Sequence, residues 1–206
     1  MRILALADIH GRKIEKPDYD VDVVFVAGDF TNADDPSFVE GVLDALSTTG
    51  AKIFAVPGNM DKKGVLEILE NRGVSIHLKT VDVGGFTFVG LGGSNPTPFG
   101  TPFEMTDDEI EKELSKLSGD IAIFHPPPNG FFDWIGENSV GSMAVRKWMD
   151  EKKPKMLICA HIHEHQGVAK HNETLIVKLG TAMKGSAALI EIGEGFDPVI
   201  VRFVSI

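Results

Sequence analysis

The chain has 206 residues, of which 43% are hydrophobic and 24% are charged, a composition typical of a globular protein. A chain of this length can bury one sizeable core, so we expect a single domain over residues 1–206. The formal net charge of −10 disfavours a protein that holds nucleic acid by neutralising phosphates, and we expect no stable nucleic-acid binding.

No apolar segment approaches the ~20 residues that a membrane span needs, and the first apolar run begins at Ile3 without a basic leader. We therefore expect a cytoplasmic protein that does not bind membranes. The single cysteine, Cys159, lies inside an apolar run, which excludes an internal disulfide and favours inert packing.

Five apolar runs have the near-continuous hydrophobic pattern of strands that are buried on both faces. They span residues 2–8, 21–27, 52–56, 121–124 and 156–160. Each run ends in polar side chains that can bind a metal ion. These side chains belong to Asp8, His10, Asp29, Asn59, His125, His161 and His163.

Helical patterns separate the early runs. One lies between Pro36 and Gly50, and a second begins at Asp61, which we expect to be its N-cap. A third follows the capping-box pattern of Thr106 and Glu109. Strands that alternate with helices indicate a substantially parallel sheet.

Further strands follow one another more closely along the chain. Glycine pairs between neighbouring runs, such as Gly84 and Gly85, predict tight hairpins. We therefore expect a second, more antiparallel or mixed sheet packed on the first. Its strands are expected at residues 81–83, 86–91, 174–179, 187–192 and 199–204.

The polar strand ends are expected to meet. Groups at the carboxyl ends of strands in an open α/β sheet face a common crevice, so the five loops should aim at one place. A strand period of two also sends His161 and His163 to the same side. Each residue alone has a structural explanation, with Asp8 or Asn59 as turn formers and His125 as a satisfied buried histidine. Their joint placement favours a metal site.

The same residues carry a resemblance to a known family. In order, residue type and strand context, they resemble the five signature blocks of the calcineurin-like metallophosphoesterases. The blocks are Asp8-x-His10, Gly28-Asp29, Gly58-Asn59-x-Asp61, His125 and Ala160-His161-x-His163. Residues 92–102 further resemble the branch of small prokaryotic Icc-related phosphoesterases. The resemblance implies an α/β fold, namely a four-layer αββα sandwich with two mixed sheets.

The resemblance also implies a site for two divalent metal ions. Mixed nitrogen and oxygen ligands suit Mn²⁺, Fe²⁺ or Fe³⁺, and Zn²⁺. By position, the family pattern assigns the first ion to Asp8, His10 and His163, the second to Asn59, His125 and His161, and a bridging role to Asp29. The implied reaction is hydrolysis of a small phosphoester by in-line attack of a metal-activated hydroxide. The residues expected to act in catalysis as well as in metal binding are Asp29, Asn59, His125 and His161.

The third block departs from the family pattern at Met60, where a histidine commonly stands. That histidine is usually credited with protonating the leaving group, whereas a thioether has no proton to donate. Loss of a general acid costs roughly 10²–10⁴ in rate. The resemblance therefore favours a phosphodiesterase for a small phosphodiester. A phosphomonoesterase is the alternative, and a non-catalytic metal-binding scaffold of the same fold is the third hypothesis.

Three residues are candidates for substrate contact. Met60 follows a ligand position, and Asn95 lies in the Gly/Pro-rich segment 92–102, whose length and lack of periodicity favour a rim or lid. Arg12 either clamps a phosphate oxygen or is a solvated loop arginine. The aromatic-rich segment 126–134 either walls the pocket or buries a subunit interface, so an oligomer is compatible with the sequence.

Other positions have only weak signals. Asn32 stands where the second block often has another aspartate, which leaves its role open. Ala160 replaces the usual glycine before His161, a change expected only to tighten the strand end. Histidines outside the blocks, including His77, are expected at the surface.

Overall fold

The computed structural model describes residues 1–206 and contains two large mixed sheets. The first sheet has the strand order β13-β12-β1-β2-β3. Its strands β1, β2 and β3 are parallel, whereas β12 runs antiparallel to both β1 and β13. The bounds of these strands are Arg2–Leu6 for β1, Val23–Ala27 for β2, Lys52–Val56 for β3, Ser186–Ile192 for β12 and Val199–Ser205 for β13.

The second sheet has the order β10-β11-β9-β6-β5-β4. Strands β11, β9, β6 and β5 are parallel, and the edge strands β10 and β4 are antiparallel to their neighbours. The bounds are Thr80–Val83 for β4, Phe86–Leu91 for β5, Ile121–Phe124 for β6, Met156–Cys159 for β9, Gly167–His171 for β10 and Thr174–Lys178 for β11.

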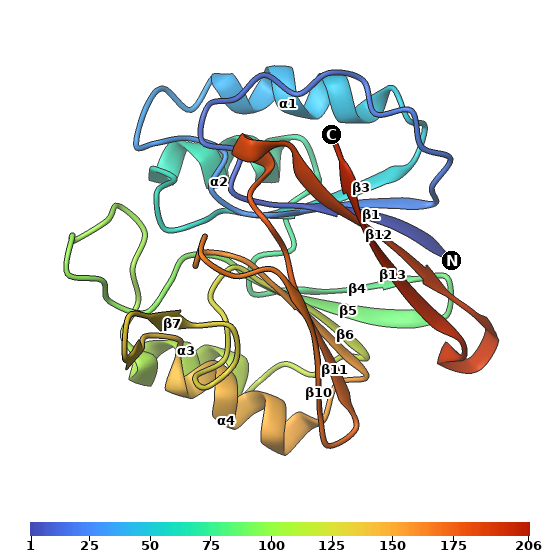
Figure 1. Cartoon of the computed structure of the whole chain (residues 1–206). Coiled ribbons are helices and arrows are strands. Elements are labelled where there is room, and N and C mark those ends of the chain that lie inside the picture. The colour runs from blue at the N-terminus through green and yellow to red at the C-terminus, as the bar shows by residue number, and fades with distance from the viewer.

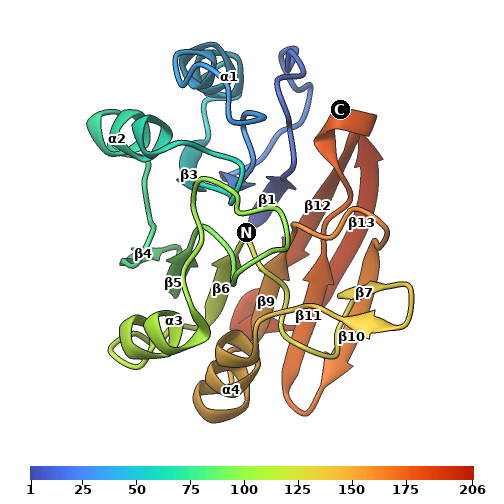
Figure 2. The ribbon, with the colours of Figure 1, turned by 90° about the vertical axis from the view of Figure 1, so that its left-hand side faces the viewer.

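Helices cover the outer faces of both sheets (Figure 1). Helices α1 (Phe38–Ser47) and α2 (Lys63–Asn71) pack on the first sheet, and α3 (Asp107–Leu114) and α4 (Met143–Lys152) pack on the second. Figure 2, turned by 90°, shows α1 and α2 on one side of the strands and α3 and α4 on the other. The four-layer αββα sandwich implied by the sequence is therefore confirmed.

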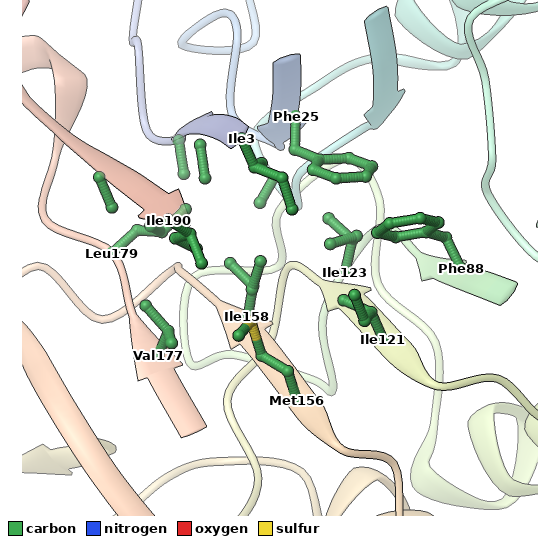
Figure 3. Packing of buried hydrophobic residues seen from close by; sticks show 14 of the residues in the cluster. Ile3, Phe25, Phe88, Ile121, Ile123, Met156, Ile158, Val177, Leu179 and Ile190 are labelled. Atoms are coloured by element: carbon green, nitrogen blue, oxygen red, sulfur yellow. The ribbon is translucent and has the colours of Figure 1, made fainter. Parts of the chain in front are cut away.

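The main core lies between the two sheets (Figure 3). Because side chains alternate along a strand, Ile3 and Ala5 of β1 face this core while Leu4 and Leu6 face the helices. Across the core, the rings of Phe25 and Phe88 lie 5.0 Å apart and join the sheets. Complete burial of such a side chain contributes about 1.5–3 kcal/mol, so this layer fixes how the sheets face each other.

The expected division of the strands between the sheets is wrong. The two ligand-bearing strands β6 and β9 lie in the second sheet beside β5, and β12 and β13 join the first sheet beside β1. The candidate site is consequently built from loops of both sheets. The parallel strands of the two sheets end on the same side of the molecule, where the long loop of residues 92–105 and the hairpin of β7 (Trp134–Ile135) and β8 (Asn138–Ser139) also lie (Figure 1).

Two local expectations are also wrong. Helix α2 begins at Lys63 with Lys62 as its N-cap, so Asp61 caps no helix. His77 is buried, and its Nδ1 accepts a hydrogen bond from the backbone N–H of Gly92 at 2.9 Å. The capping box of Thr106 before α3 is confirmed. None of the helices has the length and apolar composition that crossing a bilayer requires.

Candidate metal centre

Four of the expected ligands have a left-handed backbone conformation. Their φ angles are 55° for Asp8, 49° for His10, 54° for Asp29 and 73° for His161. Such a conformation costs of order 1–3 kcal/mol for a residue other than glycine, so the surroundings must hold it in place. The backbone N–H of Asp8 donates to Gly28 O at 2.9 Å, and that of His10 donates to Asp29 O at 2.9 Å. The loop after β1 is thereby fastened to the loop after β2.

The loop after β3 approaches Asp29 closely because residue 58 is a glycine. A Cβ atom at Gly58 would lie 2.0 Å from Oδ1 and 2.2 Å from the backbone nitrogen of Asp29. The backbone N–H of Met60 donates to the same Oδ1 at 2.8 Å. This contact orients the carboxylate of Asp29, and Oδ2 is left to face the imidazoles of the site.

The expected ligands form two groups that share Asp29. Asp8, His10, Asp29 and His163 bring their ligand atoms within 4.8 Å of one another, as do Asp29, His125 and His161. The Oδ2 atom of Asp29 lies 3.6 Å from His10 Nε2 and 3.5 Å from His125 Nε2. Asn59 joins the second group, since its Oδ1 lies 3.0 Å from His125 Nε2. The structure thus brings together all seven positions, with Asp29 placed to bridge.

Hydrogen bonds at the far side of two imidazoles turn their Nε2 atoms toward the site. His125 Nδ1 lies 2.7 Å from Ala27 O, which can only accept, so Nδ1 carries the proton. His10 Nδ1 lies 2.7 Å from Asn32 Oδ1, and Asn32 Nδ2 donates to His10 O at 3.0 Å. These bonds turn both Nε2 atoms toward the site, where a metal ion can take the place of a proton on Nε2. Asn32, whose role the sequence left open, orients a ligand.

The buried carboxylates of the site favour the binding of a positive charge. Both carboxylate oxygens of Asp8 are buried without a hydrogen-bond partner. Although burial would raise the pKa of Asp8, the approach of His163, whose Nε2 lies 3.7 Å from Oδ1, and the charges of His125 and Lys178 lower it overall. Burial likewise opposes protonation of His125, but the charge of Asp29 raises the pKa of His125 to about 9.

His161 responds in the opposite direction. Burial, reinforced by the charge of His125, lowers the pKa of His161 to about 3, so this imidazole is neutral and can act as a ligand. A buried, unpartnered carboxylate beside neutral imidazole lone pairs is the donor set that a divalent cation satisfies. The residues present therefore fit a pair of divalent ions.

A cavity of about 1050 Å³ opens beside the ligands. Its floor includes His10, Asp29 and His161, and its walls come from the loop of residues 92–105 and the β7–β8 hairpin. Phe99, at 85% exposure, stands on the rim together with the exposed Ile135 and Met143. No lysine or arginine lines the cavity. Positive charge for a phosphate must consequently come from the metal centre.

Comparison with known proteins agrees with this geometry. The sequence model of the family described as calcineurin-like phosphoesterase matches residues 1–165, which include every ligand position. The chain belongs to this family. Members of the family use a dinuclear divalent metal centre, in keeping with the two ligand groups of this phosphoesterase.

Two relatives of the phosphoesterase are similar over most of its sequence. The uncharacterized protein MJ1162 of Methanocaldococcus jannaschii is 34% identical over 191 residues, covering 86% of this chain and 87% of the relative. The 3′,5′-cyclic-nucleotide phosphodiesterase alr5338 of Nostoc sp. is 23% identical over 167 residues, covering 78% of this chain and 63% of the relative.

Solved structures share the fold of the phosphoesterase. TT1561 of Thermus thermophilus superposes with a TM-score of 0.77 at 19% identity, covering 99% of this chain and 98% of that chain. A dimetal phosphatase from Danio rerio superposes with a TM-score of 0.68 at 12% identity, covering 99% of this chain and 96% of that chain. At these identities the likeness shows the architecture alone.

The candidate substrate contacts of the phosphoesterase differ in their placement. Met60 and Asn95 line the cavity, and Oδ1 of Asn95 is a buried acceptor without a partner, while its Nδ2 donates to Val140 O at 3.0 Å. Arg12 does not line the cavity. Its guanidinium donates to Ala182 O at 2.5 Å and to Ile206 O at 2.9 Å, so in this structure it ties loops together.

Two buried charges of the site have roles that were missed from the sequence. The carboxylate of Asp61 accepts hydrogen bonds from the backbone N–H groups of Phe30, Thr31 and Gly58, and thereby joins the second and third ligand loops. Burial, followed by the charge of Asp29, raises the pKa of Asp61 to about 6.

The second missed charge is Lys178, whose Nζ donates to Leu179 O at 2.9 Å. Burial lowers the pKa of Lys178, and its charge in turn helps to lower the pKa of Asp8. The one available signal was a lysine at the end of an apolar strand.

Proposed function

We propose that this phosphoesterase is a metal-dependent phosphodiesterase that hydrolyses a small diester carrying a single phosphate. The observation that carries the proposal is Met60. Its side chain lines the cavity together with Asp29 and His161, so the place of the family's proton donor is occupied by a group that cannot donate. Loss of a general acid penalises poor leaving groups by roughly 10²–10⁴ in rate, which weighs most against natural alkyl monoesters.

The charges around the cavity also favour a diester. A monoester carries about two negative charges near neutral pH and a diester carries one. The cavity offers no lysine or arginine to compensate the additional charge, and its rim carries the acidic Glu164. The same absence of basic side chains disfavours substrates with several phosphates. Compensation therefore depends on the metal centre, where the carboxylates of Asp8 and Asp29 already offset part of the metal charge.

The remainder of the cavity suits a neutral organic group. Its rim offers the exposed apolar surface of Phe99, Ile135 and Met143, and the exposed amide of Asn138, which also lines the cavity, can hydrogen-bond to a hydroxyl or an amino group. A nucleoside-like group presents both kinds of surface. The relative from Nostoc sp., whose name states activity on a 3′,5′-cyclic nucleotide, supports the same proposal.

The ligand groups suit Mn²⁺, Fe or Zn²⁺, because they combine imidazole nitrogens with carboxylate and amide oxygens. When bound, two such ions supply Lewis acidity and a water that ionises near neutral pH. The chain itself orients the donors, with Asp29 held by Met60 N–H, His10 held by Asn32 and His125 held by Ala27 O.

The proposal is tested with Mn²⁺-loaded protein and three substrates: bis-p-nitrophenyl phosphate, p-nitrophenyl phosphate and glycerol 2-phosphate. We expect turnover of the diester to exceed that of both monoesters and to disappear with chelator. In the variant Met60→His, turnover of glycerol 2-phosphate should rise by roughly 10²-fold, because its alkoxide leaving group needs a proton. The nitrophenyl esters should change little, since nitrophenolate leaves without protonation.

Met143→His is the matched control, since this methionine lines the same cavity but lies on its exposed rim. It should leave glycerol 2-phosphate turnover unchanged. Faster turnover of monoesters by the unmodified protein would instead make it a phosphomonoesterase. Bound metal without turnover of any ester would favour the non-catalytic scaffold.

A further inference from the structure

Asn59 can bind a metal only if its side chain presents the oxygen. The two ends of an amide are similar in shape, but Oδ1 offers lone pairs whereas the Nδ2 group offers two donor hydrogens and no lone pair. In this structure Oδ1 lies 3.0 Å from His125 Nε2. Residues on the opposite side of the amide decide whether this orientation is enforced.

A carboxylate on the long loop fixes the direction of the hydrogen bonds there. One oxygen of Glu104, Oε1, lies 2.5 Å from the hydroxyl of Thr101 and 2.6 Å from that of Thr97. It also accepts from the backbone N–H of Thr101 at 2.7 Å. Partial burial would raise the pKa of Glu104, but the hydrogen bonds from Thr101 and Thr97 lower it overall. Glu104 is consequently an acceptor, and the hydroxyl proton of Thr101 must point to it.

The Thr101 oxygen can then only accept a second hydrogen bond, because its single proton is already used. Its neighbour on the other side is Nδ2 of Asn59, at 3.0 Å. The reversed amide would set Oδ1 against the lone pairs of Thr101, and it would present to the second ligand group donor hydrogens that cannot bind a metal. The hydrogen bonds that link Asn59 to Thr101 and Thr101 to Glu104 can therefore run in only one direction. They leave the amide oxygen of Asn59 facing the second ligand group.

The backbone reinforces this chain. The N–H of Phe103 donates to Asn59 O at 3.0 Å. The base of the loop is closed by hydrogen bonds from Ser94 N–H to Phe103 O at 3.2 Å and from Met105 N–H to Ser94 O at 2.9 Å. The loop that was expected to be only a rim or lid is thus attached to a metal ligand through both its backbone and a side chain.

We propose that Thr101 and Glu104 are positioning residues of the metal centre, which hold the Asn59 oxygen toward the second metal ion. The inference rests on the metal centre of the proposed function. It predicts that loss of the Thr101 hydroxyl weakens one of the two metal sites while the other keeps its affinity. Removal of a residue that orients a ligand typically costs about 10–100-fold in metal affinity.

The test is a calorimetric titration of metal-stripped protein with Mn²⁺. The unmodified protein should bind two ions, and Thr101→Val, which keeps the branched shape, should weaken one site by about 10–100-fold. Thr101→Ser retains the hydroxyl and should restore the affinity. Glu104→Gln should weaken the same site, because an amide at this position no longer dictates where the Thr101 proton points.

Thr97→Val is the matched control, since its hydroxyl bonds to the same Glu104 oxygen but does not contact Asn59. It should bind both ions with an affinity close to that of the unmodified protein. Equal melting temperatures of the metal-free variants would show that the fold is kept. Full affinity in Thr101→Val, or an equal loss in Thr97→Val, would overturn the inference. Absence of any Mn²⁺ binding by the unmodified protein would overturn the metal centre itself.

Discussion

Substitution of Gly58 by alanine should damage the metal centre through a single methyl group. The added Cβ would lie 2.0 Å from Oδ1 and 2.2 Å from the backbone nitrogen of Asp29, whereas unstrained contacts to a carbon atom begin at roughly 3.4 Å. One of the two loops must therefore move by about 1 Å or more. Both atoms belong to the only residue shared by the two ligand groups, so the displacement affects both metal sites.

The magnitude follows from the cost of overpacking, which is typically about 1–3 kcal/mol for an inserted carbon in a packed region. For a chain of this size, that corresponds to a fall in Tm of roughly 2–12 °C. A misplacement of about 1 Å can cost ~10²-fold in rate. We therefore expect a large loss of activity together with a modest loss of stability. Thermal melting of the metal-free protein and turnover of the metal-loaded protein measure the two effects separately.

Gly41→Ala provides the control, because Gly41 lies inside α1 and a Cβ there would meet no atom within 4 Å. Alanine is favoured over glycine within a helix by about 0.5–1 kcal/mol, so this variant should melt slightly higher and keep full activity. The same chemical change is thus expected to act with opposite sign at the two positions. Unchanged melting and activity in Gly58→Ala would refute the reasoning from close approach.

Two further predictions concern pH and metal. Burial lowers the pKa of His77 to about 4, so the unfolded chain binds this proton more readily and His77 should by itself lower stability by about 2 kcal/mol between pH 7 and pH 5. Urea unfolding should show a smaller loss in His77→Gln, and an identical loss would contradict the assignment. Mn²⁺ at about 100 times its Kd should stabilise the protein by about 2.7 kcal/mol, measured as a rise in Tm. This rise should vanish in Asp29→Asn but persist in part in His163→Gln, because only Asp29 belongs to both ligand groups.

The ligand set was predictable because it follows a local rule. Four of the five ligand-bearing strands, β1, β2, β6 and β9, are almost wholly buried and lead into a polar residue, and this pattern is visible within a few residues of sequence. The division of the strands between two sheets was not predictable in this way. It depends on the pairing of β1 with β12, in which Arg2 lies opposite Glu191. No local sequence pattern indicates a contact between residues so far apart in the chain.

The roles of some side chains were misjudged for the same reason, namely that they depend on contacts with distant residues. An aspartate just before a helical pattern has the local signature of an N-cap, yet Asp61 accepts its hydrogen bonds from a loop about 30 residues away. Helix α4 was not predicted, although it had a local signal: Ser142 precedes it, and Val145, Trp148 and Met149 share a buried face. Glu104 and Thr101 gave none, because their importance arises only where the long loop contacts Asn59.

The pairing of β1 with β12 has a consequence for truncated forms of the protein. A fragment that ends soon after His163 would keep every ligand and still lack the strand that covers one edge of β1. It would also lose the N–H groups of Ala182 and Met183, which donate to Ala7 O at 2.7 Å and Asp8 O at 2.9 Å. The loop of the first ligand is thus held from two sides, by the loop after β2 and by residues 182–183, and the fragment would lose the second of these attachments.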